Sequence, residues 1–194
     1  MMLLKNLSGK KIILASASPR RQQLLKGLEL DFEVLVRETD ESFPNDMKAE
    51  QIALHVARAK ADAFLHDLTS QQIVITADTV VWINDHVLNK PGTRDEAIAM
   101  ICELSGAVHH VYTGVCIQTL EKNLLFFDDT KVTFASLSES EIVHYVDEYR
   151  PFDKAGAYGA QDWIGLVGIQ KLEGSYFNVM GLPVHLVYSH LKTF

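Results

Sequence analysis

The chain has 194 residues, of which 47% are hydrophobic and 22% are charged, as is typical of one globular domain. Its formal net charge of −7 argues against a general binder of nucleic-acid polymers or of anionic membranes. Neither of the two cysteines, Cys102 and Cys116, has a metal-ligand spacing, and we expect two reduced, buried thiols in a cytoplasmic protein. No apolar run predicts a signal peptide or a membrane span. A single domain over residues 1–194 is the simplest organisation.

Apolar periodicity predicts an alternation of strands and helices along the chain. The predicted strands are Lys11–Ala15, Phe32–Val36, Gln72–Ile83, Val108–Leu120, Leu124–Ala135 and a last one near Leu166–Leu172. The predicted helices are 18–28, 47–68, 93–106, 138–149 and 183–194. Ser18 is a candidate N-cap followed by Pro19, and capping boxes are expected at Thr93…Glu96 and Ser138…Glu141. This order indicates an α/β domain with antiparallel portions in its sheet.

The stretch "IILASASPRRQQLL" (12–25) places two arginines at the start of a predicted helix. Positive charge is disfavoured there by the helix dipole. A strand, a turn of small residues and a helix start also form an anion site, however, because free backbone N–H groups converge. From this segment alone, Arg20 and Arg21 are equally consistent with phosphate binding and with solvated surface charge.

Asp78 interrupts the apolar strand pattern "IVITADTVVWI". A carboxylate in such a place costs free energy unless it is paired, hydrogen-bonded or bound to a metal. It could be satisfied locally, by backbone N–H groups or by Thr79, but the placement favours a functional acid. Lys60 lies at the edge of the apolar stripe of its helix, where a lysine usually extends to water.

Three further segments carry polar groups with two possible interpretations. Lys90 in "LNKPG" and Glu41 in "RETDESFP" could be ordinary loop residues. In "DKAGAYGAQDW" (153–163), glycines allow close approach of the backbone, while Tyr158 and Trp163 offer rings. The amide of Gln161 offers both a donor and an acceptor, which suits the edge of a base.

The sequence contains no HExxH pattern, no G-x-S-x-G turn and no arrangement of Cys with His typical of a nucleophile. A covalent mechanism is therefore disfavoured. Metal-assisted attack by water is the chemistry that fits scattered acids and bases.

Taken in order, these segments resemble the Maf family of nucleoside triphosphate pyrophosphatases. The matching motifs are "LASASPRRQQLL", "DES", "ARAKA", "ADTVV", "NKP", "SGAVHHVYTG", "DKAGAYGAQ" and "GSYFNVMGLP", which cover nearly the whole chain. Each motif is weak alone, whereas the ordered set is specific.

The resemblance implies an α/β fold of the inosine triphosphatase (Ham1) type, with an elongated mixed sheet and a cleft. It implies hydrolysis of a nucleoside triphosphate to the monophosphate and pyrophosphate, assisted by Mg²⁺ or Mn²⁺. The sequence does not determine the oligomeric state, and a homodimer is compatible with it. The residues that match the family's phosphate-binding set are Ser16, Arg20, Arg21, Lys60 and Lys90. Asp78 resembles the catalytic acid, and Glu41 resembles a carboxylate that helps Asp78 hold the metal.

The resemblance also implies the base. Arg20, Thr79 and Gln161 match the branch that acts on dTTP and UTP, whereas the branch that acts on 7-methyl-GTP has tryptophan, glutamine and glutamate there. Asp162 and Trp163 depart from the glycine that many relatives carry after the glutamine, which adds a carboxylate and an indole beside the expected base pocket.

Other functions stay open at this point. The chain could be a nucleotide-binding regulator of cell division without turnover, a family member with 7-methyl-GTP preference, or an enzyme of phosphate sugars or nucleoside monophosphates. The last would not need so many cations, and the first would not need Asp78.

Overall fold

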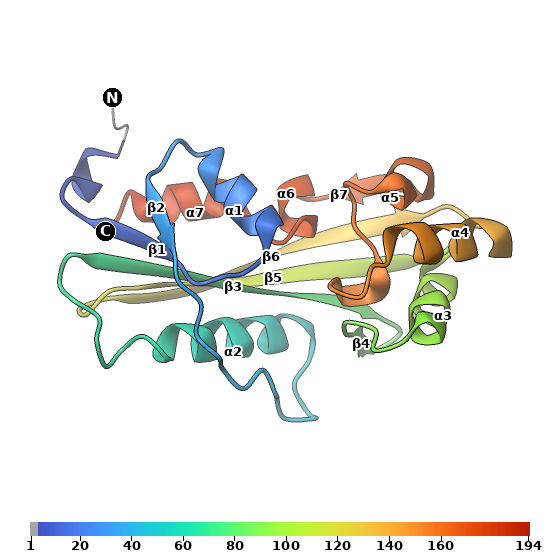
Figure 1. Ribbon diagram of the computed structural model, residues 1–194, viewed down its shortest axis with the longest axis horizontal. Coiled ribbons are helices and arrows are strands. Elements are labelled where there is room, and N and C mark those ends of the chain that lie inside the picture. The colour runs from blue at the N-terminus through green and yellow to red at the C-terminus, as the bar shows by residue number, and fades with distance from the viewer. Residues whose placement is uncertain (1–3) are drawn as a thin grey trace.

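The computed structural model describes residues 4–194 and contains one seven-stranded mixed sheet (Figure 1). The strands are β1 (Lys11–Leu14), β2 (Phe32–Val34), β3 (Gln72–Ile83), β4 (His86–Leu88), β5 (Val108–Gln118), β6 (Asn123–Phe134) and β7 (Ile169–Glu173). Their order is β2-β1-β3-β5-β6-β7, with β4 also paired to β3. β1 is parallel to β2 and β3, and every other pair is antiparallel.

The helices lie on both faces and at one end of the sheet (Figure 1). They are α1 (Pro19–Lys26), α2 (Ala49–Asp62), α3 (Arg94–Leu104), α4 (Glu139–Tyr149), α5 (Trp163–Gly168), α6 (Tyr176–Val179) and α7 (Val184–Leu191), with 3₁₀ turns η1 (Lys5–Leu7) and η2 (Ala155–Ala157). Between residues 4 and 194, no helix combines the length and the apolar character needed to cross a membrane.

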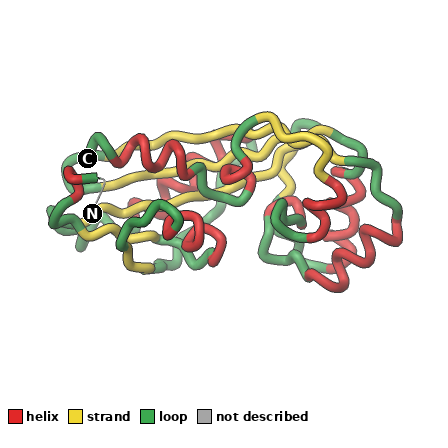
Figure 2. The backbone as a smooth tube through the Cα atoms, turned by 90° about the horizontal axis from the view of Figure 1, so that it is seen from above, coloured by secondary structure: helices red, strands yellow, loops and turns green. Residues whose placement is uncertain are grey.

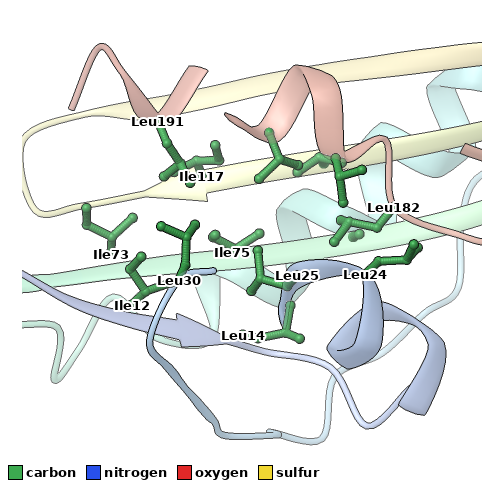
Figure 3. Close-up of a cluster of buried hydrophobic side chains, with 14 of the residues drawn as sticks. Ile12, Leu14, Leu24, Leu25, Leu30, Ile73, Ile75, Ile117, Leu182 and Leu191 are labelled. Atoms are coloured by element: carbon green, nitrogen blue, oxygen red, sulfur yellow. The ribbon is translucent and has the colours of Figure 1, made fainter. Parts of the chain in front are cut away.

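Two hydrophobic clusters share the long strands β3, β5 and β6. The first packs α1 and α7 onto one face of the sheet, where Leu14, Leu25 and Leu191 are buried (Figure 3). The second gathers α3, α4 and α5 at the other end of the strands, around Phe134 and Tyr145. Viewed from above, the long strands bridge these two groups of helices (Figure 2).

Most predicted elements are confirmed to within a few residues. The strand predicted over Leu166–Leu172 is wrong in its first half, because Trp163–Gly168 is a helix and the strand begins at Ile169. A short apolar run does not distinguish these two states. Here a Cβ on Gly165 would lie 2.0 Å from the Ala160 carbonyl oxygen, so this glycine allows a tight helical turn that the periodicity does not encode.

Two smaller expectations, the end of α2 and the capping box at Thr93, are corrected. Helix α2 ends at Asp62 instead of Leu68, because i→i+3 hydrogen bonds tighten the chain at Phe64 and Leu65. The capping box at Ser138 is present, whereas the Glu96 carboxylate accepts from the Gly92 N–H and not from Thr93.

The prediction of two buried cysteines holds only for Cys116, since Cys102 is exposed. Cys102 follows Ile101 on α3, and the 100° step of a helix turns it away from the buried stripe.

Candidate active site

The middle of β3 has an uncovered edge. Pairing with β1 ends at Ile75, and pairing with β4 begins at Val81. Residues 76–80 therefore have β5 on one side only, and the gap opens between the two groups of helices. Because side chains alternate along a strand, Asp78 points to the face covered by α2 and Thr79 to the face covered by α1.

Helix α1 brings two arginines to this gap. The Ser18 hydroxyl caps the helix by accepting from the Arg21 N–H. The Arg21 side chain then runs back toward β3, where Nε donates to the Gly181 carbonyl oxygen (2.8 Å) and Nη2 donates to Thr79 Oγ1 (3.0 Å). Nη1 reaches the hydroxyl of Ser16, which is buried at the end of β1 (3.5 Å). Arg21 is thus held by hydrogen bonds to three separate segments of the chain.

Lys60 joins the two predicted acids. Its Nζ lies 2.8 Å from Asp78 Oδ1 and 2.9 Å from Glu41 Oε1. The side chains of Lys60 and Asp78 are only 15% and 16% exposed. Lys60 therefore does not extend to water, and Asp78 is not satisfied by its own backbone or by Thr79, because the two partly buried side chains pair with each other.

Arg20 points to the opposite wall, the loop that carries η2. Its Nη1 donates to Asp153 Oδ2 (2.9 Å), while Asp153 Oδ1 accepts from Lys154 Nζ (2.8 Å). Lys154 has a side chain only 12% exposed and also lines the cavity. The sequence reasoning missed Lys154, although a lysine inside a glycine-rich loop of small, buried residues is a signal that could have found it.

The glycine-rich loop also supplies the far end of the site. Gln161 lines the cavity together with Thr79 and Gly181. Thr79 Oγ1 is 2.9 Å from Thr113 Oγ1, and Thr113 donates to the Asn178 carbonyl oxygen (3.0 Å). Buried hydrogen bonds thus fix the Thr79 hydroxyl.

Two adjoining cavities of about 670 and 120 Å³ occupy the gap. Every residue predicted to bind phosphates or metal, to act as the acid or to select the base lines one or both of them: Ser16, Arg20, Arg21, Glu41, Lys60, Asp78, Thr79, Lys90 and Gln161. Residues from six separate segments thus come together in one cleft. The larger cavity holds the arginines, Glu41 and both lysines, and the smaller one reaches Asp78 and Gln161.

Trp163 is placed differently from its prediction. Its indole packs edge-on against His144 of α4, with ring centroids 5.2 Å apart, and it does not line the cavity. Tyr158 does line the smaller cavity, but its hydroxyl is 2.8 Å from Nε2 of the buried His109. The side chain of Tyr158 is thus part of the second hydrophobic cluster.

The charges of the site act on each other. Burial favours a raised pKa for the Glu41 carboxyl, but the hydrogen bond from Lys60 and the charges of Lys60, Lys90 and Arg21 hold its pKa below the ordinary value. Burial lowers the pKa of the Arg21 guanidinium, which remains a cation. Lysines and arginines exceed the acids here, so the cleft is suited to a polyanion.

The cleft offers two carboxylates to a metal ion, those of Glu41 and Asp78. Within residues 4–194, no group of three or more His, Cys, Asp or Glu side chains could hold a metal. Glu41 and Asp78 do converge on one ammonium group. Magnesium is commonly held by one or two carboxylates together with substrate phosphates, and this acid pair fits such a site.

Comparison with known proteins finds a matching family and similar relatives over nearly the whole chain. The profile of the family described as "Maf-like protein" matches residues 11–194. A "dTTP/UTP pyrophosphatase" of Parabacteroides distasonis is 49% identical over 193 residues, 99% of this chain and 100% of that protein. A protein of the same description from Porphyromonas gingivalis is 47% identical, over 99% of this chain and 98% of its own length.

The solved structure of the Ham1 protein of Staphylococcus aureus has the same fold. It superposes with a TM-score of 0.51 at 15% sequence identity, covering 95% of this chain and 99% of that one. The predicted α/β fold of the Ham1 type, with an elongated mixed sheet, is confirmed.

Proposed function

Because this chain belongs to the Maf family, we propose that it hydrolyses dTTP and UTP to the nucleoside monophosphate and pyrophosphate. The observation that carries the proposal is the convergence of Arg20, Arg21, Lys60 and Lys90 around one partly buried acid, Asp78. The relatives described above as dTTP/UTP pyrophosphatases support the choice of base.

The cations would bind the triphosphate. A nucleoside triphosphate carries about four negative charges at neutral pH, and lysine and arginine form charge-assisted hydrogen bonds with phosphate oxygens. In the first turn of α1, Pro19 has no N–H and the Arg21 N–H donates to Ser18, so the Arg20 N–H is the backbone donor that would add to this binding. The two arginines and the positive end of the helix dipole repel one another. A triphosphate bound at this helix end would offset that repulsion with its negative charge.

Asp78 would act as the base. Lys60 occupies its Oδ1, which leaves Oδ2 to accept a proton from the attacking water. The water oxygen then forms a bond to the α-phosphorus, the bond from this phosphorus to the bridging oxygen breaks, and pyrophosphate leaves with that electron pair. Lys60 holds the Asp78 carboxylate oriented for this step.

We propose that Glu41 and Asp78 hold Mg²⁺ or Mn²⁺ together with substrate phosphates. When bound, such an ion supplies charge neutralisation at the phosphates and lowers the pKa of water. Protein treated with a chelator should release no pyrophosphate from UTP and should recover with added Mg²⁺ or Mn²⁺. Full activity in excess chelator would contradict a metal requirement.

The reaction itself is tested with a panel of nucleoside triphosphates, by measuring pyrophosphate and monophosphate together. We expect kcat/KM for dTTP and UTP to exceed that for ATP and GTP, since a hydrogen-bonded site rejects a base that leaves its polar groups unpaired. No pyrophosphate from any nucleotide would favour the non-catalytic regulator. A UTP to 7-methyl-GTP ratio of kcat/KM below one would favour the other branch and leave the reaction intact.

A further inference from the structure

Gln161 and its neighbour Asp162 fold back over the glycine-rich loop. A Cβ on Gly159 would lie 2.5 Å from Asp162 Oδ2 and 2.7 Å from Gln161 Nε2. Only glycine leaves room for both side chains at this point. The amide that lines the base end of the cavity therefore has a close, specific neighbour, the Asp162 carboxylate.

Two groups hold the Asp162 carboxylate from behind. The hydroxyl of Tyr145 on α4 accepts from the Gly159 N–H (3.1 Å), and its own proton is therefore free to be donated to Asp162 Oδ2 (2.9 Å). Tyr145 is fully buried, and burial followed by the charge of Asp162 raises the pKa of its hydroxyl, which stays protonated. The ammonium of Lys154 lies 3.7 Å from the same oxygen. Tyr145 and Lys154 thus occupy Oδ2.

The other oxygen, Oδ1, accepts from Gln161 Nε2 (3.2 Å). A carboxylate can only accept hydrogen bonds, so it selects the nitrogen end of the amide. The amide oxygen, Oε1, receives no hydrogen bond within residues 4–194 and is left to accept one from a ligand. An amide without such a partner could rotate by half a turn and exchange its donor and acceptor ends.

We propose that Asp162 is a positioning residue for base selection: it fixes the Gln161 amide so that Oε1 accepts the N3–H of uracil or thymine. The proposal rests on the proposed function, because it assumes a pyrimidine nucleotide in this cleft. Cytosine has an acceptor at N3, which would face Oε1 as a second acceptor, so the fixed amide favours UTP over CTP.

The substitution Asp162→Asn tests this without changing the shape of the side chain. Because Tyr145 must still donate to residue 162, the asparagine oxygen takes the place of Oδ2, and its NH₂ group faces Gln161. The Gln161 amide then turns its oxygen toward residue 162 and its NH₂ toward the base. We expect the UTP to CTP ratio of kcat/KM to fall by about tenfold or more, because the preferred partner is inverted.

Asp162→Ala removes the partner without offering a donor, so it should reduce the ratio less than Asp162→Asn. The control Asp147→Asn removes a carboxylate from an exposed pair with Arg94 on α3 and α4 and should leave the ratio unchanged. Tyr145→Phe removes the hydrogen bond to Asp162 Oδ2 and should also lower the UTP to CTP ratio. If Asp162→Asn does not fold, this variant tests the proposal in its place. A purely structural role of Asp162 would lower Tm and leave the ratio as it is.

Equilibrium binding of α,β-imido-UTP and α,β-imido-CTP separates this inference from the proposed function. If the unmodified protein hydrolyses neither UTP nor dTTP, the proposed reaction fails, while a fall in the UTP to CTP binding preference in Asp162→Asn still supports the positioning role. If the unmodified protein hydrolyses UTP but the folded variants keep both its kinetic and its binding preference, the positioning role is overturned and the reaction stands.

Discussion

Asp78 uses one carboxylate oxygen for Lys60 and presents the other to the cleft. Asp78→Asn keeps the size of the side chain and an acceptor for Lys60 but removes the proposed base. We expect the variant to fold and turnover to fall by about two orders of magnitude or more, the usual contribution of a general base. Pyrophosphate release from UTP measures this, with Tm as the check on folding. Near-normal release would remove Asp78 from the chemistry.

Arg20 and Arg21 are neighbours with different surroundings. Arg21 is held by Gly181, Thr79 and Ser16, whereas Arg20 reaches Asp153 on the opposite wall. Each alanine substitution should cost about 1.5–3 kcal/mol of transition-state binding if the arginine forms a charge-assisted bond to the substrate. We expect Arg21→Ala to lower kcat/KM for all substrates alike and Arg20→Ala also to change base preference.

Arg94→Ala is a matched control for both arginines, since Arg94 forms an exposed pair with Asp147 and lines neither cavity. It should leave kcat and KM unchanged. If Arg20→Ala and Arg21→Ala behave like this control, the two arginines are surface charge without a role in phosphate binding.

At the scale of elements, helix α2 sits unusually close to β5. A Cβ on Gly114 would lie 2.4 Å from the carbonyl carbon and oxygen of Ala53. Gly114 is also the partner of Asp78 in the sheet, so the close approach brings α2 down beside β3 at Asp78. Lys60, on the same helix, can reach Asp78 for this reason.

Gly114→Ala should therefore move α2 away from the sheet. We expect a loss of stability of about 1–3 kcal/mol, typical of overpacking, together with reduced turnover because Lys60 is displaced. Urea unfolding and pyrophosphate release measure the two effects. In Gly168→Ala, by contrast, the added methyl meets only Leu137 and Ile164 at 3.6 Å or more, and both quantities should change little. Equal behaviour of the two variants would contradict the packing argument.

For the whole molecule, His109 makes stability depend on pH. It is fully buried, Tyr158 occupies its Nε2, and its Nδ1 has no partner within residues 4–194. Burial, with a smaller contribution from the charge of His110, lowers the pKa of His109 from 6.5 to about 3. Because the folded-state pKa is depressed, the unfolded chain binds the proton first. The stabilisation is complete above pH 6.5 and is lost as the pH falls toward 3.

The free energy of unfolding should thus decrease by about 2 kcal/mol between pH 7 and pH 5. The carboxyl groups with lowered pKa, such as Glu41 and Asp153, change the unfolding free energy only at lower pH. His109→Gln retains a partner for Tyr158 but does not titrate, and its unfolding free energy should stay nearly constant over this range. Urea unfolding at several pH values checks this. If the unfolding free energies of the unmodified protein and of His109→Gln fall in parallel with pH, His109 is not the source of the pH dependence.

The sequence by itself determined the long strands, the capped start of α1 and the set of polar residues in apolar surroundings. Local signals suffice for these: an apolar period sets the strands, and Asp78 stands out because an unpaired buried carboxylate is costly. It did not determine the helix at Trp163–Gly168 or the inward position of Lys154. Those depend on contacts with Ala160, Asp153 and Asp162.

Only the tertiary structure decided which charges are partners. Lys60 and Asp78 are 18 residues apart, Arg20 and Asp153 are 133 apart, and neither pair has a periodic signature. They meet because the pairing of β3 with β1 ends at Ile75 and its pairing with β4 begins at Val81, which opens the sheet where α1, α2 and the 153–161 loop converge. A charge pair depends on distance in space, and chain topology sets that distance. The residue types are therefore visible in the sequence, whereas their pairing is a property of the fold.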